Sequence, residues 1–122
     1  MDSIEKAKKF YDEAKKEYER GIKEKNEILI RDASEKLWGA VVEATDGLLA
    51  KHGIYVPPNA DAHYARRTEL TKIGLSRMRE KYSDFGTVLH GDCFYFGKCP
   101  PEIIFRAFID EVKKYIENAE RF

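Results

Sequence analysis

Residues 31–49, RDASEKLWGAVVEATDGLL, carry the clearest helical pattern in the chain and its only tryptophan. The apolar side chains recur at three- and four-residue steps, which puts them on one face of a helix: Ala33, Leu37, Ala40, Val41, Ala44 and Leu48. Gly39 and Ala40, beside Trp38, are small enough to let a second helix approach while the indole fills the adjacent space. The stretch therefore predicts a core helix around which the rest of the chain is organised.

Similar stripes predict a helix before this stretch and another at the end of the chain. Residues 3–24 form the first, in which Asp2 and Ser3 can cap the start and Gly21 is a point of weakening or termination. Pro100 and Pro101 suit the start of the last helix, where a missing N–H costs little. The stripes are Ile4, Ala7, Tyr11, Ala14 and Tyr18 in the first helix, and Ile104, Phe108, Val112, Tyr115, Ile116 and Ala119 in the last.

Glycines and prolines divide the chain between residues 50 and 100. Gly53 suits a helix C-cap, and the prolines at 57 and 58 predict an ordered loop. A third helix is predicted over residues 61–82, and Asp84 can cap a short fourth helix over residues 85–96. The third helix has a predicted core face of Tyr64, Thr71, Leu75, Met78 and Tyr82. Since no strand pattern is present, we predict an all-α fold, an up-and-down bundle of four long helices plus one short helix, in one domain spanning residues 1–122.

Charge and composition argue against several classes of partner. The 22 basic and 22 acidic side chains cancel, which removes any global electrostatic case for binding nucleic acid or a membrane. No apolar run reaches the ~20 residues of a membrane helix, and the first ten residues lack the apolar centre of a signal peptide. We therefore expect a cytoplasmic protein with no membrane partner, no cofactor and no role as a reader of DNA sequence. Abundant Lys and Glu, with no Gln, favour a thermophilic source.

The third predicted helix also carries a candidate binding face. Leu70 and Ile73 fall opposite its core face, between Arg66 and Arg77. Such an apolar and basic surface can bind protein or RNA, because guanidinium groups hold phosphate and apolar side chains drive association. Exposed charge on a helix is usually solvated, so a plain solvent face is the alternative.

The densest cluster of reactive side chains surrounds His90 and consists of His90, Asp92, Cys93, Tyr95 and Cys99. His90 could act as a general base, because imidazole exchanges protons near neutral pH, and a structural role is the alternative. Two cysteines with five residues between them and one nearby histidine fall short of the paired spacing of zinc sites, so we predict no metal. Two separate thiols are the first expectation for the cysteines, and a Cys93–Cys99 disulfide is the alternative.

Three parts of the sequence carry a family resemblance: ASEKLWGAVVEA at residues 33–44, the preceding Gly21, and LHGDCFYFG at residues 89–97. The chain resembles the archaeal PaREP family, which is related to the HEPN superfamily. The resemblance implies a helical bundle, frequently dimeric, that acts as a ribonuclease or as the partner of a small nucleotidyltransferase. The resemblance implies that active members carry, at the fourth helix, an arginine followed by four to six residues and then a histidine, and that the two copies of this motif face each other across a dimer cleft.

His90 matches the histidine of that motif, whereas the arginine position departs from it. Residues 81–89 contain no arginine, and the nearest one upstream is Arg79, eleven residues before His90. The interrupted motif favours a non-catalytic homodimeric binding or regulatory module, with RNA or a nucleotidyltransferase as partner. The alternatives are a metal-independent ribonuclease that uses His90 with Arg79 or another arginine of the third helix, and a structural subunit of a larger assembly.

Overall fold

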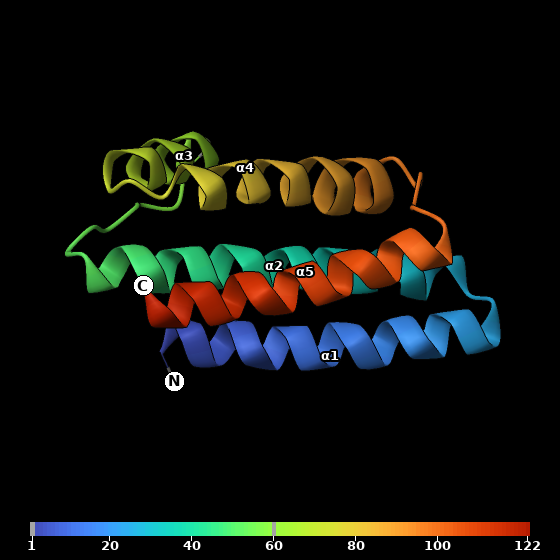
Figure 1. Cartoon of the computed structure of the whole chain (residues 1–122). Coiled ribbons are helices and arrows are strands. Elements are labelled where there is room, and N and C mark those ends of the chain that lie inside the picture. The colour runs from blue at the N-terminus through green and yellow to red at the C-terminus, as the bar shows by residue number, and fades with distance from the viewer. Residues whose placement is uncertain (1, 60) are drawn as a thin grey trace.

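The computed structural model describes residues 2–59 and 61–122, which form five α-helices and one π-helix. They are α1 (Ser3–Glu24), α2 (Glu27–Lys51), α3 (Ala62–Lys72), α4 (Ser76–Phe85), the π-helix η1 (Gly86–Tyr95) and α5 (Glu102–Arg121). Figure 1 shows α1, α2 and α5 packed side by side, with α3, α4 and η1 in a second layer above them. The described residues contain no strand, so the all-α prediction is confirmed. No helix among them has the length and apolarity to cross a membrane.

α1 and α2 form a tightly packed antiparallel hairpin. The Asp2 carboxylate accepts a hydrogen bond from the Glu5 N–H at 2.8 Å, so Asp2 caps α1 as predicted. Gly21 does not end this helix, which continues for one more turn. A Cβ atom on Gly21 would lie 2.9 Å from Cγ1 of Ile30, so glycine is required there for the two helices to approach this closely.

α2 is the central element of the fold, because it contacts every other helix. All six residues of its predicted stripe are fully buried, and Trp38 is 6% exposed. A Cβ atom on Gly39 would lie 3.4 Å from the Phe10 ring, so a second helix, α1, does approach at this position. The prediction of a core helix from residues 31–49 is confirmed, and the helix extends beyond that stretch at both ends.

The predicted third helix is in fact two helices, separated at Gly74. This residue has φ +81°, in the left-handed region that glycine adopts without steric cost. The Leu75 N–H donates to the Leu70 carbonyl at 2.9 Å, which closes the end of α3 in the manner of a Schellman motif. The predicted core face over residues 61–82 was wrong for α3, where Leu70 is fully buried and Tyr64 is 70% exposed. The break lets α3 turn a different side toward the core from the one that a continuous helix would present.

The predicted cap at Asp84 was also wrong. α4 continues without interruption into η1, and both junction residues, Phe85 and Gly86, have helical backbone angles. At its end η1 has the wider hydrogen bond of a π-helix, from the Phe96 N–H to the Gly91 carbonyl at 3.0 Å. The break predicted near residue 84 thus lies at Gly74, and α4 with η1 form one continuous helical rod.

α5 returns along the bundle and closes the core. Pro101 precedes its first residue, as the sequence predicts, and the second half of the predicted stripe is buried. In the first half the buried residues are Phe105 and Ile109, whereas Ile104 is 47% exposed. The predicted stripe was therefore one residue out of register at the start of the helix.

Candidate functional site

A cleft of about 230 Å³ lies between α2, α3 and the α4–η1 rod. Its walls combine two imidazoles, a guanidinium, a phenol and an indole; the lining residues are Trp38, His63, Arg67, Tyr82, Ser83, Gly86, Thr87 and His90. Helical spacing explains how they meet, because His63 and Arg67 are one turn apart on α3, and Tyr82, Gly86 and His90 follow at four-residue steps on the rod. α3 and the α4–η1 rod therefore direct titratable groups into one cleft, and α2 supplies its indole wall.

His90 is held by a carboxylate from α2. Its Nδ1 lies 2.9 Å from both Oε1 and Oε2 of Glu35, so the Nδ1–H donates to the carboxylate. The ring is also stacked on Phe94 at a centroid distance of 6.1 Å. With the proton on Nδ1, Nε2 of the neutral ring is left as an acceptor. This is the arrangement by which a carboxylate fixes the orientation and tautomer of a general base.

His63 lies in a second hydrogen-bond network, which extends to α2 through Arg66. The Tyr82 hydroxyl is 2.7 Å from Nδ1 of His63, and Nη1 of Arg66 donates to the same atom at 3.1 Å. Arg66 is almost fully buried and forms a bidentate pair with the Asp46 carboxylate, at 2.7 and 3.1 Å. Because Nδ1 of His63 accepts, its Nε2 carries the proton and is a donor.

The surroundings of this network lower the pKa of His63, mainly by burial. Burial lowers its pKa below the ordinary value of 6.5, and the charges of Arg66, of a protonated His90 and of Arg67 lower it further. Burial raises the pKa of Tyr82, although Arg66 acts against the shift. Burial alone would lower the pKa of Arg66, but Asp46 and Tyr82 outweigh that effect and raise it. Arg66 is thus a permanent cation that favours neutral His63.

Arg67 supplies a cation to the cleft itself. Its guanidinium lies over the ring of Tyr64, 5.1 Å from the centroid, and has no carboxylate within 4.0 Å among the described residues. Tyr64 is exposed, so the pair stands at the surface beside the cleft. An unpaired guanidinium of this kind is suited to bind an oxyanion, phosphate in particular.

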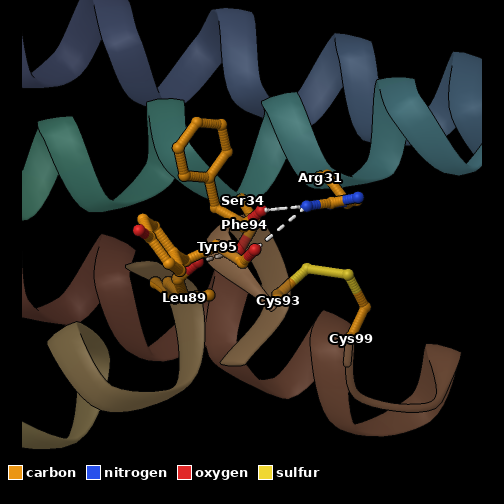
Figure 2. The surroundings of a disulfide bond; sticks show 7 residues. All are labelled: Arg31, Ser34, Leu89, Cys93, Phe94, Tyr95 and Cys99. Atoms are coloured by element: carbon orange, nitrogen blue, oxygen red, sulfur yellow. Dashed lines mark hydrogen bonds between the residues drawn. A yellow bond between two sulfur atoms is a disulfide. The ribbon is translucent and has the colours of Figure 1, made fainter. Parts of the chain in front are cut away.

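The C-terminal part of η1, from Leu89 onward, is held by side chains of α2 and by a disulfide (Figure 2). Arg31 donates to the Phe94 carbonyl at 2.7 and 3.0 Å and to the Tyr95 carbonyl at 3.2 Å. Ser34, which is buried, donates to the Leu89 carbonyl at 2.8 Å. Carbonyls at the end of a helix lack partners within it, so the bonds from Arg31 stabilise the π-helical end that carries Phe94. The bond from Ser34 joins the middle of η1 to α2.

Cys93 and Cys99 form this disulfide, so the first expectation, two separate thiols, was wrong and the alternative is observed. Cys93 is fully buried on η1, and Cys99 lies in the connection to α5. The bond joins the end of η1 to the segment that follows it. Among the described residues, no group of three or more His, Cys, Asp or Glu side chains is arranged to hold a metal ion.

The other residues singled out from the sequence are dispersed. Arg79 does not line the cleft; it lies about three helical turns before His90, with Nη2 3.8 Å from Glu80. The candidate binding face over residues 66–77 does not form an exposed strip, because Arg66 and Leu70 are buried. Ile73 packs against the core and Arg77 borders a different groove. The expectation that Leu70 faces away from the core was wrong, since the break at Gly74 changes the orientation of α3.

Sequence reasoning assigned no role to His63 and did not select Glu35. The four-residue spacing of His63 and Arg67 was visible and could have marked one polar helix face. Glu35 lies 55 residues from His90, a separation for which the sequence contains no local signal. Comparisons of the chain with protein-family models, with curated proteins and with solved structures found no match.

Proposed function

We propose that this protein is a metal-independent ribonuclease whose active site is the cleft between α2, α3 and the α4–η1 rod. The observation that carries the proposal is the hydrogen bond from His90 to Glu35, because His90 lines the same cleft as His63 and Arg67. Cleavage of RNA through its own 2′-hydroxyl needs a base for the hydroxyl proton and positive groups for the charge on phosphate. Side chains of the cleft meet both needs.

In the proposed reaction, Nε2 of His90 takes the proton of the 2′-hydroxyl while Glu35 holds the imidazolium that forms. The 2′-oxygen attacks the adjacent phosphorus, and the bond from phosphorus to the 5′-oxygen of the next nucleotide breaks. The guanidinium of Arg67 and the Nε2–H of His63 stabilise the charge on the non-bridging oxygens. The leaving 5′-oxygen takes a proton from water, and the His90 imidazolium returns its proton to the hydroxide that forms. The products are a 2′,3′-cyclic phosphate and a 5′-hydroxyl.

The HEPN-like resemblance is part of this proposal. That superfamily pairs a histidine with an arginine, and His90 here shares a cleft with Arg67 of α3, not with Arg79. The cation would therefore come from a different helix from the one that the sequence motif uses. The proposal is thus a HEPN-like active site whose arginine is displaced to α3.

The test is cleavage of 5′-labelled single-stranded RNA in the presence of EDTA. We expect His90→Asn to lower the cleavage rate at least about a hundredfold, the scale of a general base. Arg67→Gln should lower it at least about tenfold through lost charge stabilisation. DNA of the same sequence should not be cleaved, because it lacks the 2′-hydroxyl.

His52→Asn is the matched control, since His52 is exposed at the end of α2 and does not line the cleft. Circular dichroism should give the same helix content for all variants. Cleavage by His90→Asn at the wild-type rate would refute the assignment, and so would a wild type that leaves RNA intact.

A homodimeric binding or regulatory module is the second candidate, supported by one end of the bundle. Large apolar side chains are exposed where α2 begins, η1 ends and α5 begins; we call this surface the apolar end, and it consists of Ile28, Tyr95, Phe96, Ile103 and Ile104. These three segments lie at the same end of the molecule (Figure 1). Exposed apolar patches of this kind mark association surfaces.

Light scattering after size exclusion separates this candidate from a monomeric enzyme. A dimeric wild type that Phe96→Asp with Ile103→Asp converts to a monomer would support it. A wild type that is monomeric at tens of micromolar would refute it and would leave the ribonuclease proposal unaffected.

A further inference from the structure

A groove larger than the cleft lies between α4 and α5 and shares no lining residue with it. Its volume is about 410 Å³, within the range of pockets that bind small molecules. Met78 and Tyr115, both nearly fully buried, line it from the two helices. The Tyr115 hydroxyl is hydrogen-bonded to Thr45 in the core at 2.7 Å, so Tyr115 offers the groove ring atoms and no free hydroxyl.

The rim of the groove is positively charged. Lys81 on α4 and Glu111 on α5 form an ion pair across it at 2.7 Å, so these two charges cancel. Arg77 and Lys114 also line the groove, and neither has a carboxylate within 4.0 Å among the described residues. Two uncompensated cations therefore stand over an apolar floor, although the whole chain has no net charge.

We propose that this groove is a second binding site, which takes a small amphiphilic anion. The apolar body of the ligand packs against Met78 and Tyr115, and its acidic head group lies between Arg77 and Lys114. Carboxylate and phosphate monoester heads share the required chemistry, since guanidinium and ammonium groups hydrogen-bond to either. The inference is independent of the ribonuclease proposal, because no residue of the cleft takes part.

The probes are two fluorescent dyes, 8-anilinonaphthalene-1-sulfonate and its uncharged analogue N-phenyl-1-naphthylamine. The binding of each dye to the full chain is measured by fluorescence titration. We expect the sulfonate to bind more tightly than the neutral dye. Arg77→Glu with Lys114→Glu should weaken sulfonate binding at least about tenfold, the scale of one lost charged hydrogen bond, and leave the neutral dye unchanged. Displacement of the bound sulfonate by decanoate or by decyl phosphate identifies which head group is preferred.

Lys16→Glu with Lys113→Glu is the matched control, because both side chains are exposed outside the groove and the change in net charge is the same. If the reversed pair fails to fold by circular dichroism, Arg77→Gln with Lys114→Gln serves the same purpose. Equal affinity for the two dyes, or equal weakening by the control pair, would overturn the proposal. A protein that binds the sulfonate dye but does not cleave RNA would refute the ribonuclease proposal and leave the proposal for the groove intact.

Discussion

Gly86 and Gly91 offer a sharp test of how the cleft is built, because both lie in η1 but face different surroundings. A Cβ atom on Gly86 would lie 3.1 Å from Cη2 of Trp38, and 3.5 Å from two further indole carbons. A Cβ atom on Gly91 would meet only the Gly86 carbonyl oxygen, at an ordinary contact distance of 3.7 Å. Replacement by Ala therefore adds the same methyl group to a crowded position and to an open one.

The magnitudes follow from two opposing effects. Replacing Gly by Ala inside a helix stabilises it by about 0.5–1 kcal/mol, because the unfolded chain loses backbone freedom. Overpacking a filled core costs about 1–3 kcal/mol. Trp38 cannot easily yield, since it is nearly buried and packs on Tyr82 and His63 at centroid distances of 5.0 and 5.4 Å. Gly91→Ala should thus stabilise the protein, and Gly86→Ala should be less stable than it by about 1–3 kcal/mol.

Urea unfolding followed by circular dichroism measures both free energies of unfolding, and equal slopes would show that the unfolded states are comparable. Trp38 fluorescence adds a local readout, because a displaced indole changes its emission in Gly86→Ala and not in Gly91→Ala. Equal stabilisation by the two substitutions would refute the contact between the indole and η1. The wall of the cleft would then have to be placed differently.

Two further predictions concern the disulfide and His63. Replacing Cys93 and Cys99 together by Ser removes a cross-link between residues six apart, and loop entropy predicts that the free energy of unfolding falls by about 2 kcal/mol. Urea unfolding measures this loss. A reductant that leaves the free energy of unfolding of the wild type unchanged would contradict the prediction. His63 has a pKa below 6.5 in the folded protein, so near that pH the unfolded chain binds more protons. The free energy of unfolding should therefore fall as the pH drops below 6.5, and it should fall less in His63→Asn. Parallel plots of the free energy of unfolding against pH for the two proteins would contradict the lowered pKa of His63.

Local periodicity was sufficient for most of the fold. The stripe of residues 31–49 is buried as predicted, because six apolar side chains on one face have no better partner than the core. The prediction failed where one glycine changed the direction of the chain. A helical pattern continues through Gly74, so the sequence read as one helix, and only the left-handed conformation of this residue reveals the break.

The cleft was harder to predict from the sequence than the core. His90 was identifiable by residue type, but its partner Glu35 lies on a helix that was assigned only to the core. The buried pair of Arg66 with Asp46 spans 20 residues and two helices, and Arg66 instead looked like part of an exposed basic strip. Pairs of this kind depend on how helices rotate about their axes, which residue spacing within one helix does not encode.

The sequence by itself therefore determined that the chain is helical and which residues of α2 form its core face. These properties arise from backbone preferences and from apolar spacing within a few residues. Only the tertiary structure decided that His63, Arg67 and His90 line one cleft, that Glu35 bonds to His90, and that Cys93 pairs with Cys99. The physical reason is that packing sets how each helix is rotated about its axis and how far it is shifted along its neighbours. A single left-handed residue such as Gly74 also changes which side chains of the adjoining helices face the core.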